Sequence, residues 1–250
     1  MPLIPVGDRR VHVQELGEHG PLVVLIHPLT FSLAVWYFSV APFLARSCRV
    51  LLYDLRGHGR SDPAPDGYDL KTLAGDLRDL LCVKLGATTP VGIAGWSSAG
   101  SLALRFALDH PDWTSAVAAV DAPMPPYPLR ERVMDEGRDP EEIVRQFPSE
   151  EVPVTRGGRR RALRTNQHVR LRNETTFARD FEAEGSFNDE LPGLQKPAFL
   201  LYGDQSPFLD VGQCLAARLP RAELEVIPGN HYIPLSRREQ VADCLAGFFA

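Results

Sequence analysis

Two adjacent serines, Ser97 and Ser98, lie at a junction between an apolar stretch and a helix-like stretch. The surrounding residues read Gly95-Trp96-Ser97-Ser98-Ala99-Gly100, after the apolar run Val91 to Ala94 and before Ser101 to Leu108. A sharp strand-to-helix turn pushes one side chain out of the sheet edge, and the backbone bends that tightly only between small neighbours such as Gly95 and Ala99. The Ser97 hydroxyl is therefore a candidate nucleophile. The backbone amide of Ser98, at the start of the helix, would point at the same place and stabilise an oxyanion.

The turn at Ser97 belongs to a chain in which short apolar runs alternate with longer helical patterns. The expected strands are Val11 to Leu16, Leu22 to Ile26, Val50 to Tyr53, Val91 to Ala94, Ala116 to Val120, Ala198 to Tyr202 and Leu224 to Ile227. The expected helices are Trp36 to Arg46, Leu70 to Leu85, Ser101 to His110, Val211 to Leu219 and Arg237 to Phe249. Short continuous apolar runs are typical of strands covered on both faces, and their alternation with helices predicts a mostly parallel α/β sheet.

This alternation breaks between Pro123 and Lys196, where closely spaced prolines give way to charged amphipathic helical patterns. The break predicts a helical cap, residues 123–196, inserted into a core domain of residues 1–122 and 197–250. The cap would cover the carboxyl ends of the strands, where ligands bind in such sheets.

The length and composition of the chain limit the classes of function. With 250 residues, of which 44% are hydrophobic, the chain can bury one large core and carry an inserted subdomain. A net charge of -5 without a sustained basic tract argues against nucleic acid as the main partner. The arginine-rich stretch 156–164 is flanked by acidic residues, so we expect a solvated helix face there. The expected partner is a small-molecule substrate, and the oligomeric state stays open.

The sequence also carries expectations about the compartment. No apolar run approaches the roughly 18 residues of a membrane span, and prolines interrupt the N-terminus where a signal peptide would need an apolar core. The cysteines, none in a C-x-x-C pair, are Cys48, Cys82, Cys214 and Cys244. We therefore expect no membrane segment, a cytoplasmic location, and reduced, buried thiols.

Five segments of the chain, in their order and at their intervals, resemble those of the α/β-hydrolase family. They are His27-Pro28-Leu29, the loop from Asp54 to Ser61, the turn at Ser97, Gly203-Asp204, and Gly229-Asn230-His231. The resemblance extends over essentially all 250 residues. It implies the α/β-hydrolase fold, with a mostly parallel central sheet flanked by helices, and leaves the substrate open.

By this resemblance, Ser97 corresponds to the family nucleophile and His231 to its general base. A serine hydroxyl is a poor nucleophile until a neutral imidazole takes its proton, and a histidine pKa of about 6.5 suits that exchange. Leu29 corresponds to the residue whose backbone amide forms the oxyanion hole together with that of Ser98. Pro28 departs from the usual glycine, and a proline has no amide to donate.

The acid of the expected triad is absent from the position where the family usually places it. That position, three residues after Gly203, holds Ser206, which cannot carry the charge. Asp204 lies in the same loop but two residues early. Asp121 ends the apolar run Ala116 to Val120, at a strand end that supplies the acid in some family members such as haloalkane dehalogenases. We favour Asp121 and keep Asp204 as the alternative, although either could simply be a turn residue.

The other histidines of these motifs, His27 and His58, are interpreted as structural, with His27 bracing the oxyanion loop. The Cys, His and carboxylate residues show no metal-ligand spacing, and no G-x-G-x-x-G motif opens a helix. We therefore expect no metal and no cofactor.

The function that these residues favour is cleavage of a carboxylic ester or lactone through an acyl-enzyme on Ser97. Side chains near the motifs are expected to line an apolar substrate pocket: Phe31, Trp36, Trp96, Met124, Tyr127, Phe208 and Tyr232. The same triad could serve a thioesterase or a C–C bond hydrolase. A ligand-binding protein with little or no turnover is the third alternative, which Ser206 at the usual acid position keeps open.

Overall fold

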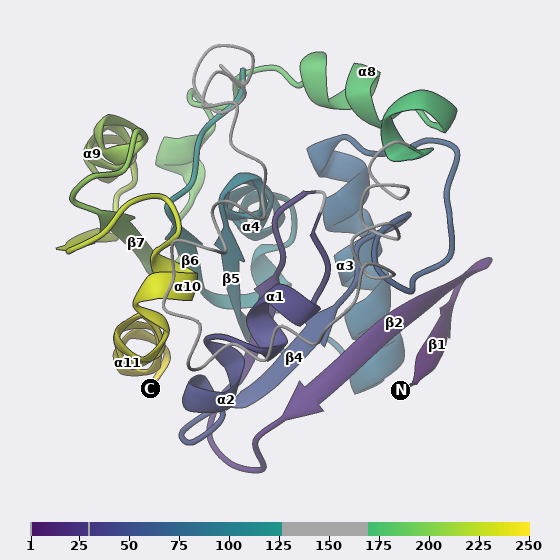
Figure 1. Cartoon of the computed structure of the whole chain (residues 1–250), viewed down its shortest axis with the longest axis horizontal. Coiled ribbons are helices and arrows are strands. Elements are labelled where there is room, and N and C mark those ends of the chain that lie inside the picture. The colour runs from purple at the N-terminus through teal and green to yellow at the C-terminus, as the bar shows by residue number, and fades with distance from the viewer. Residues whose placement is uncertain (1, 30, 127–169) are drawn as a thin grey trace.

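The computed structural model describes residues 2–29, 31–126 and 170–250. Within these residues the strands form one eight-stranded sheet in the order β1-β2-β4-β3-β5-β6-β7-β8 (Figure 1). The strands are β1 (Leu3–Val6), β2 (Arg9–Leu16), β3 (Leu22–Ile26), β4 (Arg49–Tyr53), β5 (Val91–Trp96), β6 (Thr114–Val120), β7 (Ala198–Gly203) and β8 (Ala222–Ile227). Neighbouring strands pair in parallel along the part of the sheet ordered β4-β3-β5-β6-β7-β8. β1 pairs with β2, and β2 with β4, in the antiparallel direction, so these two strands form an antiparallel edge. The predicted mostly parallel α/β sheet is therefore confirmed.

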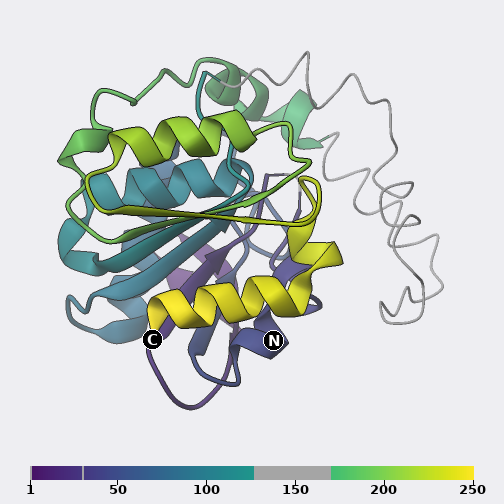
Figure 2. The ribbon, with the colours of Figure 1, turned by 90° about the vertical axis from the view of Figure 1, so that its left-hand side faces the viewer.

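Helices cover both faces of the sheet (Figure 2). One face carries α1 (Ala34–Tyr37), α2 (Ala41–Leu44) and α11 (Arg238–Phe249), and the other carries α3 (Leu70–Leu85), α4 (Ser98–Asp109) and α9 (Leu209–Arg218). The shorter elements are η1 (Pro111–Trp113), α8 (Phe177–Glu182), η2 (Leu191–Gly193) and α10 (Ile233–Ser236).

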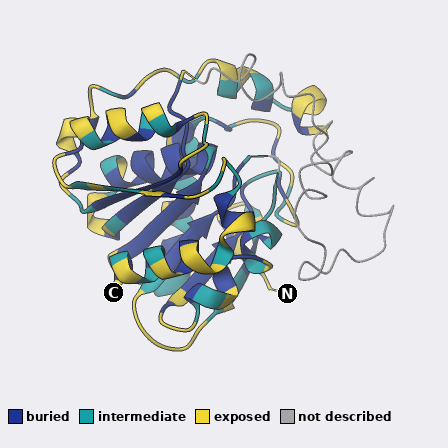
Figure 3. Ribbon diagram, turned by 60° about the vertical axis from the view of Figure 1, so that its left-hand side comes forward, coloured by how far each residue is buried: buried dark blue, intermediate teal, exposed yellow. Residues whose placement is uncertain are grey.

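The central strands are covered on both faces, which explains their uninterrupted apolar sequences. In β3, Val24 and Ile26 belong to the core on the side of α3 and α4, whereas Val23 and Leu25 belong to the core on the side of α2 and α11. All four side chains are inaccessible to solvent, and the middle of the sheet is buried throughout (Figure 3). Because side chains alternate between the faces of a strand, a strand with two covered faces needs apolar residues at every position.

Two elements differ from the sequence prediction. β1, which contains Pro5, is not among the expected strands. It is the edge strand of the sheet, where a missing amide is tolerated. The helix expected from Trp36 to Arg46 consists of two short helices, α1 and α2. Pro42 in the first turn of α2 lacks the amide that a continuous helix would use there.

The cysteines are free, and Cys48 is buried. Cys82 on α3 and Cys214 on α9 are exposed, while Cys244 is half-buried. The expectation of uniformly buried thiols is therefore wrong, because two of them lie on the solvent faces of helices.

The described part of the predicted cap includes a helical stretch, residues 170–174, and α8. Two carboxylates of this segment accept backbone amides at the start of α3: Asp180 accepts that of Tyr68, in the loop before the helix, at 3.1 Å, and Glu184 accepts that of Leu70, the first residue of the helix, at 2.8 Å. These bonds hold the segment against the core. Most of the predicted cap lies outside the described residues, so its boundaries stay a prediction.

Candidate active site

β5 runs into α4 through a single residue, Ser97. Ser97 has φ 57° and ψ -134°, a backbone conformation that residues other than glycine rarely adopt. Its amide donates to the Val120 carbonyl at 2.9 Å, and its carbonyl accepts the Gly100 amide at 2.7 Å. A Cβ at Gly95 would lie 1.9 Å from the Ala99 carbonyl oxygen, so the turn requires glycine there. The neighbouring strand and the first turn of α4 together fix the turn that carries the candidate nucleophile.

The structure brings His231 and Asp121 into direct contact. His231 Nδ1 lies 2.8 Å from Asp121 Oδ1. Asp121 follows β6, is inaccessible to solvent, and has a left-handed φ of 47°. A carboxylate can only accept, so Nδ1 of His231 carries a proton and Nε2 of the neutral ring is the free base. This is the protonation pattern that a general base needs.

Asp204, the alternative acid, makes a different contact. Its Oδ1 accepts the Gly229 amide at 2.8 Å, and its own amide donates to the Ile227 carbonyl at 2.9 Å. The residue is exposed and joins the loops that follow β7 and β8. The structure therefore places Asp121, and not Asp204, on the imidazole of His231.

Aromatic side chains surround the His231 ring. The ring centroids of Phe208, Tyr232 and Trp96 lie 5.1, 5.2 and 5.9 Å from that of His231. Trp96 Nε1 also donates to the His231 carbonyl at 3.0 Å, which ties the residue before Ser97 to the histidine loop. Among the described residues, no hydrogen bond joins the Ser97 hydroxyl to His231. In free enzymes such bonds are often long and tighten only when substrate binds.

The other predicted pocket residues occupy different positions. Phe31 packs against Trp96, with ring centroids 5.8 Å apart. Trp36 is inaccessible to solvent, and its indole nitrogen donates to a carbonyl of β3 at 2.9 Å, so it is a core residue. Met124 is 9% exposed and belongs to the core on the side of α3 and α4. Tyr127 lies outside the described residues.

The two predicted oxyanion-hole residues, Leu29 and Ser98, are neighbours. The Leu29 amide donates to the Ser98 hydroxyl at 3.3 Å. Ser98 is the first residue of α4, where backbone amides have no partner within the helix. The Leu29 amide therefore lies beside the residue that follows Ser97, and the Ser98 hydroxyl accepts its hydrogen bond. The motif around Ser97 predicts a role only for the backbone amide of Ser98. Nothing in the sequence indicates that the Ser98 hydroxyl contacts the Leu29 amide.

A buried histidine fixes the loop that carries Leu29. His27 Nε2 accepts the Leu55 amide at 3.0 Å, so Nδ1 carries the proton and donates to the Pro28 carbonyl at 2.8 Å. Burial lowers the pKa of His27, which keeps the ring neutral. His58 is also inaccessible to solvent and packs against His27, with ring centroids 5.4 Å apart. Both histidines occupy bracing positions.

A buried carboxylate, Asp54, holds the same loop further along. Its Oδ1 accepts the Leu33 amide at 2.7 Å. Its Oδ2 accepts the Arg60 amide at 2.8 Å and lies 2.7 Å from His12 Nδ1. Three donors on one buried carboxylate fix the loops after β3 and β4 relative to each other.

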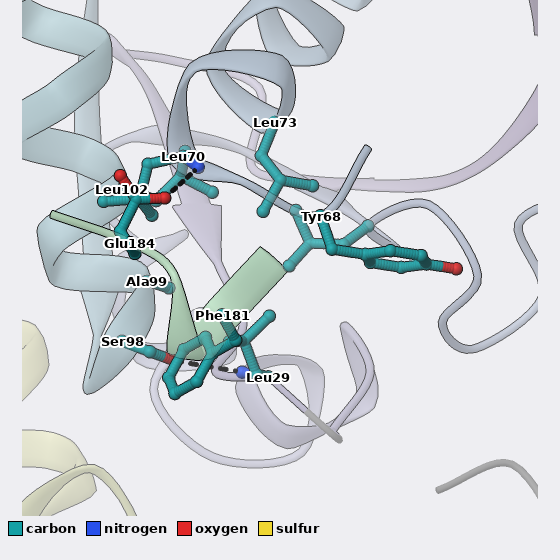
Figure 4. A pocket seen from close by; sticks show the side chains of 10 residues that line it. Leu29, Tyr68, Leu70, Leu73, Ser98, Ala99, Leu102, Phe181 and Glu184 are labelled. Atoms are coloured by element: carbon teal, nitrogen blue, oxygen red, sulfur yellow. Dashed lines mark hydrogen bonds between the residues drawn. The ribbon is translucent and has the colours of Figure 1, made fainter. Parts of the chain in front are cut away.

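A largely apolar cavity lies beside Leu29 and Ser98 (Figure 4). Its lining residues are Leu29, Leu55, Tyr68, Leu70, Leu73, Ser98, Ala99, Leu102, Phe181 and Glu184. Burial raises the pKa of Glu184, whose carboxylate accepts the Leu70 amide. Most of these residues were not predicted as pocket residues, because Tyr68, Leu70, Leu73, Leu102, Phe181 and Glu184 lie outside the sequence motifs.

Within residues 2–29, 31–126 and 170–250, no group of three or more His, Cys, Asp or Glu side chains is arranged to hold a metal ion. No helix in that part of the chain combines the length and the apolar character needed to cross a bilayer.

The chain is similar to known proteins both in sequence and in fold. A family model described as alpha/beta hydrolase fold matches residues 21–173. "Putative non-heme chloroperoxidase" from Synechocystis sp. is 28% identical, with 99% of each chain covered. Fluoroacetate dehalogenase from Burkholderia sp. is 35% identical over 52% of this chain and 43% of its own length. The crystal structure of the enol-lactonase from Burkholderia xenovorans LB400 matches with a TM-score of 0.73 at 21% identity, covering 99% of both chains.

The structural match supports the sheet order and helical layers described above. The family model, which covers more than half of the chain, spans the turn at Ser97 and the loop of Leu29. The chain belongs to the α/β hydrolase family.

Proposed function

We propose that this protein is a serine hydrolase that cleaves a carboxylic ester or lactone of a small, largely apolar substrate. The observation that carries the proposal is the 2.8 Å contact between Asp121 and His231 Nδ1, next to the turn that presents Ser97. A serine on a strained turn, an imidazole and a buried carboxylate supply a nucleophile, a general base and a group that orients the base.

In the proposed reaction, His231 Nε2 takes the proton of the Ser97 hydroxyl as Oγ attacks the substrate carbonyl. The amides of Leu29 and Ser98 stabilise the resulting oxyanion, for which the Leu29 amide leaves the Ser98 hydroxyl. His231 then protonates the leaving alcohol, and an acyl-enzyme remains on Ser97. Water activated by His231 releases the acid and restores the serine, while Asp121 stabilises the imidazolium in both steps.

A serine nucleophile does not suit the reaction after which one relative, the fluoroacetate dehalogenase, is named. If Ser97 displaced a halide from a saturated carbon, the product would be an ether, which water activated by an imidazole does not cleave. Attack of Ser97 on a carbonyl gives an ester, which that water does cleave. A serine at this position therefore supports an acyl substrate. The enol-lactonase of similar fold acts, by its name, on such a substrate, because a lactone is a cyclic ester.

The cavity beside the two oxyanion amides supports the choice of an apolar substrate. Most of its lining consists of leucine and aromatic side chains, and Leu29 and Ser98 are among the lining residues. The cavity itself is about the size of a water molecule, so an apolar part of the substrate would lie against this apolar surface rather than fill the cavity, and the apolar area removed from water favours binding. Thioesters present the same carbonyl, so they belong in the substrate panel.

Labelling with a fluorophosphonate tests the proposal, because this probe reacts with an activated serine. The wild-type protein should gain the mass of one probe on the peptide that contains Ser97, and Ser97→Ala should gain none. Ser98→Ala is the matched control and should still be labelled. A panel of esters, lactones and thioesters then ranks the substrates by kcat/KM. Absence of labelling in the wild-type protein would contradict the proposal and support a ligand-binding protein without turnover.

A further inference from the structure

The hydroxyl of Ser206 faces the carboxylate that contacts His231. Ser206 Oγ donates to Asp121 Oδ1 at 2.5 Å, and the same oxygen lies 2.8 Å from His231 Nδ1. The other carboxylate oxygen, Oδ2, accepts the Gly203 amide at 2.9 Å. The buried carboxylate thus has three donors, as a buried charge requires. One of these donors, the Ser206 hydroxyl, takes no part in the proposed reaction.

The direction of the Ser206 hydroxyl is set by the backbone around it. The Phe208 amide donates to Ser206 Oγ at 3.0 Å, which occupies a lone pair and leaves the hydrogen for Asp121. The Ser206 amide donates to the Gly203 carbonyl at 3.1 Å and closes the turn. Phe208 packs against the His231 ring. The hydroxyl is therefore held in place on the same loop that borders the imidazole.

Tyr232 packs its ring against His231, and three other ionisable side chains near these loops bond to backbone atoms. Asp204 accepts a backbone amide, and Arg237 and Tyr202 donate to backbone carbonyls. Within the described part of the chain, Asp121 is the charged side chain that hydrogen bonds to His231. A change in how this carboxylate is held should therefore act on His231 directly.

We propose that Ser206 is a positioning residue that sets how Asp121 acts on His231, an inference that rests on the proposed function. By donating to Oδ1, the hydroxyl holds this oxygen toward the imidazole and disperses part of its negative charge. A hydrogen bond to the carboxylate stabilises the charged form and weakens its pull on other donors. Without the hydroxyl, the carboxylate is less well oriented toward Nδ1 of His231, which should lower the rate. The carboxylate also keeps more of its negative charge and attracts the protonated imidazole more strongly.

Ser206→Ala, which removes the hydroxyl, and Ser206→Thr, which keeps it, test this role. In Ser206→Ala we expect kcat to fall roughly 10-fold, the effect of losing one hydrogen bond to a charged group. KM should stay within about twofold, since Ser206 does not line the cavity. The acidic limb of the kcat/KM profile should move to higher pH, because the imidazolium is stabilised. Ser206→Thr should keep the wild-type limb and lose less than about threefold in kcat.

An NMR titration of the His231 imidazole provides a readout that needs no turnover. The pKa of His231 should rise in Ser206→Ala and stay at its wild-type value in Ser206→Thr. An unchanged titration together with unchanged kcat in Ser206→Ala would overturn the inference. Equal losses of kcat in both variants with an unchanged titration would also overturn it, by assigning Ser206 a purely structural role. Hydrolysis that survives in Ser97→Ala would refute the proposed function instead, while the titration would still decide the role of Ser206.

Discussion

The acid side and the oxyanion side of the candidate active site are built from different kinds of contact. On the acid side, side chains meet side chains: Asp121 contacts His231, and Ser206 contacts Asp121. On the oxyanion side, the expected donors are backbone amides, and the buried side chains of His27 and Asp54 hold the backbone that carries them. Substitutions on the acid side should therefore change the chemistry first, whereas those on the oxyanion side should change the stability first.

The largest effect is expected for Asp121→Asn. The amide cannot stabilise an imidazolium as the carboxylate does, and the equivalent change in another serine hydrolase lowers kcat by about 10⁴-fold. Asp204→Asn is the matched control: it alters only an exposed contact with a backbone amide, so kcat should stay within roughly threefold. Both values are measured on one ester, with circular dichroism as the folding control. A severe loss in Asp204→Asn with a mild one in Asp121→Asn would assign the acid to Asp204.

Asp54→Asn should act on stability instead and lower the free energy of unfolding by roughly 3 kcal/mol. The amides of Leu33 and Arg60 cannot rotate away, so the NH₂ group of an asparagine meets a backbone donor on one side. Around Asp121, two of the three donors are side chains that can reorient or change tautomer. Urea denaturation of both variants measures the difference. If Asp121→Asn were destabilised as much as Asp54→Asn, the distinction between the two sides would not hold.

A smaller effect is expected for Ser98→Ala. The change removes the hydroxyl that accepts the Leu29 amide and keeps the Ser98 amide itself. If the oxyanion side depends on backbone donors, kcat/KM should stay within roughly threefold of wild type. Steady-state kinetics on the same ester measure this ratio, with Ser97→Ala as the inactive reference. A loss in Ser98→Ala as deep as that in Ser97→Ala would show that the oxyanion side also depends on a side chain.

The smallest effect is expected for Glu184→Gln, in the lining of the cavity beside Leu29 and Ser98. Burial raises the pKa of Glu184, so the folded state binds the proton more tightly than the unfolded state, and stability falls as the pH rises through the raised pKa. Glu184→Gln keeps an acceptor for the Leu70 amide and should slightly raise the free energy of unfolding at neutral pH. Below the ordinary glutamate pKa, the two proteins should be equally stable. Glu182→Gln, at an exposed site on α8, is the control. If both variants changed the free energy of unfolding equally, burial of Glu184 would not be the cause of the effect.

The sheet and the turn at Ser97 are predictable from sequence because their signals are local. Continuous apolar runs report strands with two covered faces, and Gly95 reports a backbone too close to Ala99 for a side chain. The choice between Asp121 and Asp204 is not local. Both follow parallel strands, and the one that reaches His231 depends on how far each strand end extends in three dimensions.

Side-chain direction is the second thing that the sequence does not contain. Ser206 counts only as a missing acid until its hydroxyl is seen against Asp121. Trp96 and Phe208 are predicted to line the substrate pocket because they lie near motifs, and the structure adds that both rings pack against His231. Proximity along the chain gives no information about which neighbour an aromatic ring will touch.

The backbone conformation of Ser97 bears on how this protein can evolve. A φ of 57° is a conformation that glycine adopts freely and that is expected to cost other residues about 1–3 kcal/mol. A glycine at this position would relieve the strain and remove the hydroxyl in the same step. Stability alone would therefore favour glycine at this position, and under the proposed function the serine is retained because its hydroxyl is the nucleophile.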